Sequence, residues 1–181
     1  MKELSLHILD IMQNSIVAGA DRISLTLVED SHADLLSFRI EDNGKGMPKE
    51  MVQSVMNPFV TGRTTRRVGL GIPLLKAAAE LTGGGISLSS REGEGTVIEA
   101  RFGLSHIDRQ PLGDMAGTML GILTSYEDIV FIYTHRVDEQ EYTLNTQEMR
   151  DILGDVSFSQ PEVMLWLSEY LNENETALYQ K

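Results

Sequence analysis

The feature that most constrains this fold is the order in which apolar residues change period along the first 104 residues. Residues 4–18 carry leucine, isoleucine and methionine at helical spacing, whereas residues 23–27 and 36–40 alternate apolar with polar residues, as strands do. The short connection through residues 30–34 predicts that these two strands form an antiparallel pair.

The same part of the chain then continues with two predicted helices and two further strands. Pro48 opens a short helix that we expect to reach about Val55, and residues 71–81 form a longer helix that Gly83, Gly84 and Gly85 terminate. Two predicted strands follow, over residues 86–89 and 96–102. The sequence therefore predicts an α+β fold, a two-layer sandwich in which helices cover a sheet.

Charge divides the chain into two unequal parts. The protein has 15 basic and 27 acidic residues, a net charge of −12, but residues 1–104 carry only −2 of it and residues 105–181 carry −10. We take this shift as a predicted domain boundary, with Pro111 and Gly113 in the joint. An acidic balance of this size argues against a nucleic-acid-coating role, which favours a basic face.

Residues 105–181 predict a small acidic α+β extension. The pattern gives a helix over 114–124, a hairpin over 129–137 and 141–144, and two short helices. Asn145 with Glu148, and Ser159 with Glu162, have capping-box spacing at the starts of those helices. The last helix carries an apolar stripe that we interpret as core in preference to a partner interface, formed by Val163, Trp166, Leu167, Tyr170 and Leu171.

The cellular setting is indicated only indirectly. The chain has no cysteine, which fits a reducing, cytoplasmic environment. Acidic residues interrupt the N-terminal segment, so we predict neither a signal peptide nor a membrane anchor there.

Three glycine-bearing segments stand between the predicted elements, at residues 41–47, 68–71 and 93–96. None has the spacing of a Walker loop or of a dinucleotide fingerprint. Taken singly, each is an ordinary turn or helix entry. Together they suggest close approach of the backbone to a ligand, and the segment that opens the 71–81 helix would suit a phosphate.

Polar side chains near these segments match such a ligand. Asp42 follows a strand and offers an acceptor for an exocyclic amine, while Asn14 offers a hard oxygen to Mg²⁺. Asp10 lies four residues before Asn14, on the same face of the first helix. Arginines suited to a polyphosphate precede the 71–81 helix, namely Arg63, Arg66 and Arg67.

The order of these segments resembles the GHKL superfamily of ATPases, which groups type II topoisomerases, heat-shock chaperones, histidine kinases and mismatch-repair proteins. The resemblance covers about residues 1–104 and is greatest to the histidine-kinase catalytic domain. Residues 10–15 look like the N box, 42–47 the first glycine box, 58–61 with 69–71 the F box and second glycine box, and 93–96 the last box. It implies a Bergerat-type sandwich with a mixed, mainly antiparallel sheet.

The resemblance also implies ATP and Mg²⁺ as ligands. Asn14 would hold Mg²⁺, Asp42 would take the adenine amino group, and Thr96 would support the adenine side. The first glycine box would leave room for the base through Gly44, Gly46 and Met47. The phosphates would meet Gly69, Leu70 and Gly71 beneath a lid over about residues 60–68, which carries Thr61, Arg63, Arg66 and Arg67.

Two positions differ from the family pattern. Hydrolytic members have glutamate at the position of Asp10, where it activates water, and a glycine is common where this chain has Arg67. Histidine kinases also carry a phosphoacceptor box, which His106 and its neighbours echo on the opposite side of the domain.

Two functions remain open at this point. One is a stand-alone protein kinase-like regulator in which Asp10 accepts the proton of a substrate hydroxyl. The other is a nucleotide-gated interaction switch with weak or no catalysis, whose acidic residues 105–181 bind a protein partner.

Overall fold

The structure, a computed structural model, describes residues 2–57 and 71–180. Its first elements follow the expected helix–strand–strand–helix–helix–strand–strand order. They are α1 (Leu4–Val17), β1 (Arg22–Asp30), β2 (Leu35–Asp42), α2 (Lys49–Met56), α3 (Gly71–Leu81), β3 (Gly85–Arg91) and β4 (Gly95–Gly103). The later elements are α4 (Met115–Ser125), β5 (Val130–Val137), β6 (Gln140–Asn145), α5 (Thr146–Leu153) and α6 (Pro161–Ala177).

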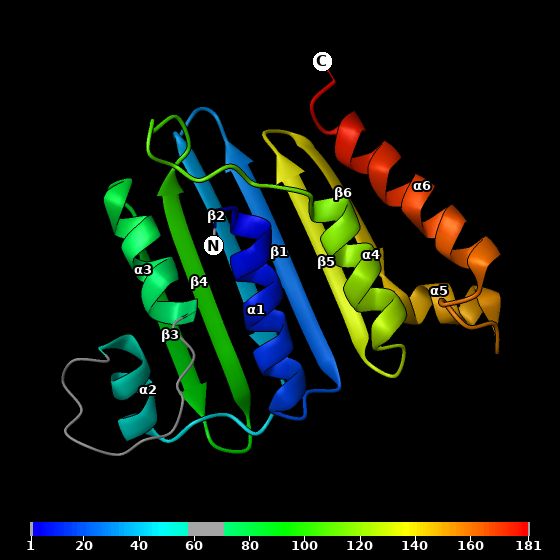
Figure 1. The fold of residues 1–181 in the computed structure, drawn as a ribbon, viewed down its shortest axis with the longest axis horizontal. Coiled ribbons are helices and arrows are strands. Elements are labelled where there is room, and N and C mark those ends of the chain that lie inside the picture. The colour runs from blue at the N-terminus through cyan, green and yellow to red at the C-terminus, as the bar shows by residue number, and fades with distance from the viewer. Residues whose placement is uncertain (1, 58–70, 181) are drawn as a thin grey trace.

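All six described strands form one sheet in the order β3-β4-β2-β1-β5-β6. The β1–β2 pair is antiparallel as expected, and among the described strands only β1 and β5 run parallel. The predicted mixed, mainly antiparallel sheet is confirmed. The hairpin of β5 and β6 extends this sheet beyond β1, so the sheet is continuous across residue 104 (Figure 1); a domain boundary there stays a prediction.

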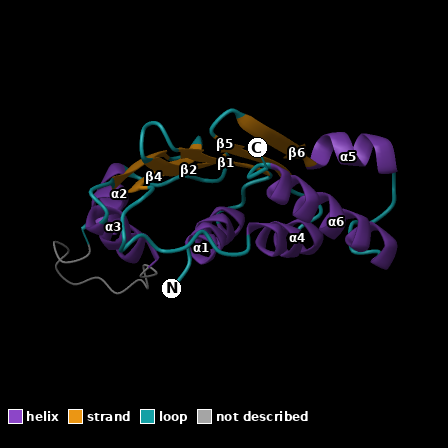
Figure 2. Ribbon diagram, turned by 90° about the horizontal axis from the view of Figure 1, so that it is seen from above, coloured by secondary structure: helices purple, strands orange, loops and turns teal. Residues whose placement is uncertain are grey.

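The helices α1, α3, α4 and α6 lie on one side of the sheet (Figure 2). Their apolar faces meet the inward side chains of the strands, such as Leu25 and Phe38, in a single buried core. Alternation along β1 explains this arrangement, because Ile23, Leu25 and Leu27 are buried while Arg22 and Thr26 are exposed. The two-layer sandwich is confirmed.

The C-terminal helix differs from expectation in two ways. It is 17 residues long rather than short, and it begins at Pro161 after Gln160, without a side-chain cap. The predicted Ser159–Glu162 capping box is wrong, because the Ser159 backbone N–H donates to Glu127 and its hydroxyl pairs with Ser157. Asn145 caps the start of α5 as expected, since its side chain accepts from the Gln147 N–H and its amide also donates to Glu148; the reciprocal backbone bond of a capping box stays a prediction.

The predicted apolar stripe of α6 is core except at one position. Leu167 and Leu171 are buried, and Val163 and Tyr170 pack partly buried against the core. Trp166 is 48% exposed and stacks on Tyr170 with 5.4 Å between ring centroids. That indole therefore lies at the surface rather than in the interior.

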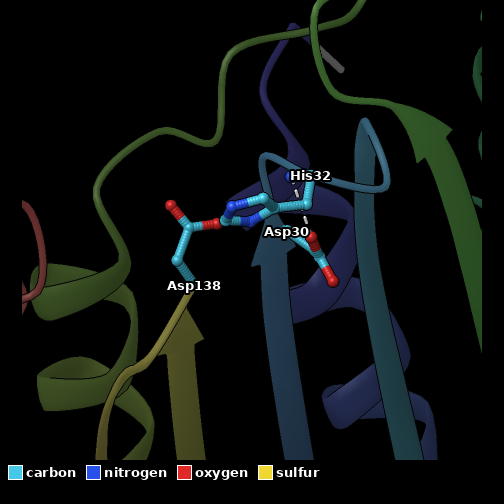
Figure 3. Close-up of side chains that lie close together, drawn as sticks. All are labelled: Asp30, His32 and Asp138. Carbon is cyan, nitrogen blue, oxygen red and sulfur yellow. Dashed lines mark hydrogen bonds between the residues drawn. The ribbon is translucent and has the colours of Figure 1, made fainter.

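Asp30 and His32 at the tip of one hairpin lie close to Asp138 at the tip of the other (Figure 3). Asp138 accepts from the backbone N–H of Ser31 at 2.7 Å and from its hydroxyl at 2.9 Å. Asp30 closes its own turn by accepting from the His32 and Ala33 N–H groups, which brings Asp30, His32 and Asp138 close together. Asp30 therefore closes the turn that carries it, whereas Asp138 joins its own turn to the turn of the other hairpin. No helix in the described ranges is long and apolar enough to cross a membrane.

Candidate functional site

A cavity of about 320 Å³ lies between the sheet and the helices α1, α2 and α3. Ile40, Leu88 and Ile98 of the sheet line its floor, and Val55 and Ile72 line its sides. Polar side chains enter this apolar cavity at few places, among them Asn14, Asp42, Lys45 and Thr96. A mostly apolar cleft with a few converging polar groups is the usual form of a small-molecule site.

Asp42 is the buried carboxylate of this cavity, at 9% exposure. The hydroxyl of Ser15 donates to Oδ2 at 2.6 Å, and the backbone N–H of Gly44 donates to Oδ1 at 2.9 Å. Both oxygens are thereby fixed in position, and each still has a lone pair available. The carboxylate is set as a rigid acceptor facing the cavity.

Two of the glycine segments pack their backbones closely against neighbouring strands beside Asp42. Gly46 has φ of +66°, and a Cβ there would overlap the carbonyl of Arg91. Gly95 has φ of +117°, and its Cβ would overlap the carbonyl of Asp42. Both positions require glycine, because a left-handed conformation and a close approach coincide there.

Thr96 and Asp42 are directly opposite each other across the β2–β4 ladder. The Thr96 hydroxyl lies 2.8 Å from that of Ser90, which also accepts from the Met47 N–H at 2.9 Å. The structure thus brings Asp42, Gly44, Gly46, Met47 and Thr96 together, as the sequence predicted. Ser15 and Ser90 had no role assigned beforehand, and a serine in a helix or strand carries no local signal of one.

Of the residues expected near phosphate and metal, the described ones are Asn14, Asp10 and Gly71. Asn14 is exposed and lines the cavity. Asp10, one turn earlier on α1, is half-buried and does not line it. Its carboxylate rests against Gly71, where a Cβ would overlap it, so this glycine allows α1 and α3 to pack closely.

Six expected site residues lie outside the described residues, namely Thr61, Arg63, Arg66, Arg67, Gly69 and Leu70. Their contribution stays a prediction.

His106 is described and exposed, and it follows Gly103, which pairs with Leu35. Asp42 pairs with Thr96 at the other end of the same ladder. Seven residues of strand separate the two places, roughly 20 Å, so the fold does not bring His106 to the cavity.

A second buried polar cluster lies between α6 and the sheet, and sequence reasoning missed it. The fully buried ring of His135 on β5 sits between two carboxylates, with Nδ1 2.9 Å from Glu175 and Nε2 3.3 Å from Glu29. The hydroxyls of Tyr133 and Tyr142 donate to Glu175, and that of Tyr179 donates to Glu29.

Burial and partners act in opposite directions on these groups. Burial alone would lower the pKa of His135, but its hydrogen bonds and charge pairing with Glu175 and Glu29 outweigh burial and raise it. Burial alone would raise the pKa of Glu175 and of Glu29, but hydrogen bonds from His135 and the tyrosines hold both pKa values low. The cluster therefore holds an imidazolium between two carboxylates.

Comparison with known proteins shows where this fold occurs. A family described as "Histidine kinase-, DNA gyrase B-, and HSP90-like ATPase" matches residues 2–106. A putative NtrY-like sensor histidine kinase of Rickettsia conorii is 28% identical over 92 residues, which are 51% of this chain and 15% of that protein. An uncharacterized sensor-like histidine kinase of Rhizobium meliloti is 40% identical over 84 residues, 43% of this chain and 16% of that protein. The chain thus spans less than a fifth of these relatives.

Solved structures of similar fold extend over nearly the whole chain. The N-terminal domain of a DNA repair protein covers 99% of this chain and 57% of its own, with a TM-score of 0.55 and 12% identity. The Aquifex aeolicus MutL ATPase domain complexed with ADP covers 94% of this chain and 70% of its own, with a TM-score of 0.51 and 14% identity. At these identities the likeness establishes the fold alone.

Proposed function

This chain belongs to the histidine kinase-, DNA gyrase B- and HSP90-like ATPase family, and on that premise we propose that its cavity binds ATP with Mg²⁺. The observation that carries the proposal is Asp42, a buried carboxylate held by Ser15 and Gly44 at the end of an apolar cavity. A fixed acceptor in that setting suits the exocyclic amine of adenine, while Ile40 and Ile98 offer apolar contact to a flat base.

The residues at the cavity mouth fit a magnesium ion. Asn14 presents an amide oxygen there, and the carboxylate of Asp10 lies on the same face of α1. Hard oxygen donors of this kind are what Mg²⁺ takes, usually together with phosphate oxygens and water. When bound, the ion would supply positive charge to the phosphates; Asn14 would hold it in place.

We assign the phosphate side to the start of α3 and to residues before it. Gly71 begins that helix, whose N-terminus favours an anion. Gly69, Leu70, Thr61 and the three arginines at 63, 66 and 67 complete this side of the proposal. They rest on the sequence resemblance.

Binding is tested by thermal unfolding with and without millimolar Mg²⁺–ATP. We expect ATP to raise the melting temperature of the unaltered protein and Asp42→Asn to abolish the shift, because the amide places a donor where the amine must donate. Glu41→Gln is the matched control, since the preceding side chain is exposed and should leave the shift intact. A protein that shows no ATP shift would refute nucleotide binding.

For the bound nucleotide we propose a protein kinase-like role in a cytoplasmic setting. Asp10 would accept the proton of a substrate hydroxyl as the γ-phosphoryl group is transferred. Incubation with γ-labelled ATP and candidate protein substrates should label a substrate, and Asp10→Ala should abolish the label while ATP still binds. The acid and base stability of the label identifies the acceptor, and an acid-labile label on His106 would require transfer between molecules, given its place at the far end of the ladder.

A nucleotide-gated interaction switch is the second candidate. The observation favouring it is that β5 pairs with β1, so the acidic part shares the sheet that carries Asp42. Tight ATP binding without transfer or hydrolysis, together with nucleotide-dependent binding of a basic protein, would support the switch and contradict the kinase.

A further inference from the structure

Ser90 of β3 joins three separate pieces of the cavity's adenine end without lining that cavity. Its hydroxyl oxygen accepts from the Met47 N–H at 2.9 Å and lies 2.9 Å from the carbonyl oxygen of Gly95. It also lies 2.8 Å from the hydroxyl of Thr96. One side chain thus connects the first glycine segment, the last glycine segment and a cavity-lining threonine.

Counting protons fixes the direction of each of these hydrogen bonds. A serine hydroxyl has one proton, and the Gly95 carbonyl can only accept, so the Ser90 proton goes to Gly95. Thr96 must then donate its own proton to Ser90. The reverse direction would leave two oxygens with only lone pairs facing each other at 2.9 Å.

The consequence for the cavity concerns Thr96. Because its proton is directed at Ser90, the Thr96 oxygen has only lone pairs left for a ligand. Asp42, opposite it across the ladder, also presents only acceptors, since Ser15 and Gly44 donate to it. Thr96 and Asp42 therefore both require a hydrogen-bond donor on the ligand.

We propose that Ser90 is a positioning residue that makes this end of the site discriminate a 6-aminopurine from a 6-oxopurine. The inference rests on the proposed nucleotide binding. An exocyclic amine has two N–H groups and can donate to both acceptors, whereas a 6-oxopurine has a carbonyl in that place and a single N–H on the adjacent ring nitrogen, so at least one acceptor is left unpaired. The Ser90 hydroxyl donates one hydrogen bond and accepts two, so it has no capacity left for a ligand. Its effect on the ligand therefore passes through Thr96.

The test compares ADP with inosine diphosphate, both with Mg²⁺, by calorimetry. The unaltered protein should bind ADP more tightly. In Ser90→Ala the Thr96 hydroxyl is free to turn and donate to the carbonyl of hypoxanthine, so the preference for ADP should fall roughly fivefold, mainly through tighter binding of inosine diphosphate. Ser90→Thr keeps a hydroxyl and should keep the preference. Ser89→Ala, a change at the neighbouring exposed serine, is the matched control.

A purely structural role for Ser90 predicts a different result, namely weaker binding of both nucleotides at an unchanged ratio, and that result would overturn the proposal. Thr96→Val gives an independent answer if Ser90→Ala does not fold. Loss of an acceptor lowers the preference for ADP, whereas loss of a donor raises it, and a rise would also overturn the proposal. Absence of ADP binding to the unaltered protein would instead count against the proposed function.

Discussion

Residues 2–57 and 71–180 contain two buried carboxylate clusters, and they differ in how much hydrogen-bonding capacity each leaves unused. At Asp42 two donors, Ser15 and Gly44, hold the carboxylate while it faces a cavity. At His135 the imidazole fills the space between Glu29 and Glu175, and three tyrosine hydroxyls donate to the same two carboxylates. A cluster whose hydrogen-bonding groups are all paired with one another holds secondary-structure elements together. A cluster with unused acceptors can accept hydrogen bonds from a ligand.

The two clusters also sit on different elements. The Asp42 cluster connects α1, β2 and the turn after β2, all from the first part of the chain. The His135 cluster connects β1, β5, β6 and α6, and so fastens the acidic part to the first part. The proposed ligand site and the contacts that join the two parts of the chain therefore lie in separate clusters.

The largest expected effect comes from breaking the self-satisfied cluster. His135→Ala leaves Glu29 and Glu175 buried without their cation, and should lower the free energy of unfolding by about 3–5 kcal/mol. Urea unfolding measures this, with His106→Ala at an exposed histidine as control. Asp42→Asn should cost under about 1 kcal/mol of stability while abolishing nucleotide binding; equal stability losses in the two variants would contradict the comparison.

The second prediction concerns pH. The raised pKa of His135 and the lowered pKa values of Glu29 and Glu175 define the pH range in which the cluster stabilises the fold most. The histidine contributes fully below its ordinary 6.5, and its contribution is lost as pH rises through the raised value. The glutamates contribute fully above their ordinary 4.5 and lose that contribution as pH falls.

The difference in unfolding free energy between the unaltered protein and His135→Ala should therefore be greatest between pH 4.5 and 6.5 and shrink above it. Urea titrations across this range measure the difference. The tyrosines stay protonated throughout, since burial and the neighbouring Glu175 or Glu29 raise their pKa values. A difference that does not change with pH would mean that folding leaves the pKa of His135 unshifted, and a difference that shrinks as pH falls below 6.5 would mean that the imidazole is neutral in the fold.

A smaller effect is expected from Ser15→Ala, which removes one of the two donors to Asp42. The carboxylate can then rotate, so ADP affinity should fall roughly tenfold while stability falls by only about 1 kcal/mol. Calorimetry and urea unfolding give the two numbers. Ser15→Thr keeps the donor and should retain affinity if the methyl group is accommodated. A variant with large stability loss and unchanged affinity would assign Ser15 to the core rather than to the site.

The smallest effect should come from Tyr179→Phe, which deletes one donor at the edge of the His135 cluster. Tyr179 is half-exposed, and Glu29 keeps its bond from His135. We expect a loss of about 0.5–1 kcal/mol and no change in nucleotide binding. A loss as large as that of His135→Ala would show that the cluster depends on every member.

Local signals explain which parts of the fold could be predicted. The bounds of α3 were predicted from the glycines on either side of it, and Asp42 and Thr96 were placed together by motif order. The pairing of β5 with β1 could not be predicted, because alternation of apolar and polar residues identifies a strand but not the strand with which it pairs. His135 was missed for the same reason, since its two carboxylates come from positions 106 residues before it and 40 residues after it.

The pairing of β5 with β1 has a consequence for solubility. Without the β5–β6 hairpin, β1 would be the last strand of the sheet, with its whole length of backbone N–H and C=O groups open beside Ile23, Leu25 and Leu27. An open edge of that length invites pairing with another chain and aggregation. With the hairpin in place the outermost strand is β6, six residues long with exposed Gln140 and Glu141 on it. We therefore expect the β5–β6 hairpin to protect the β1 edge of the sheet from self-association.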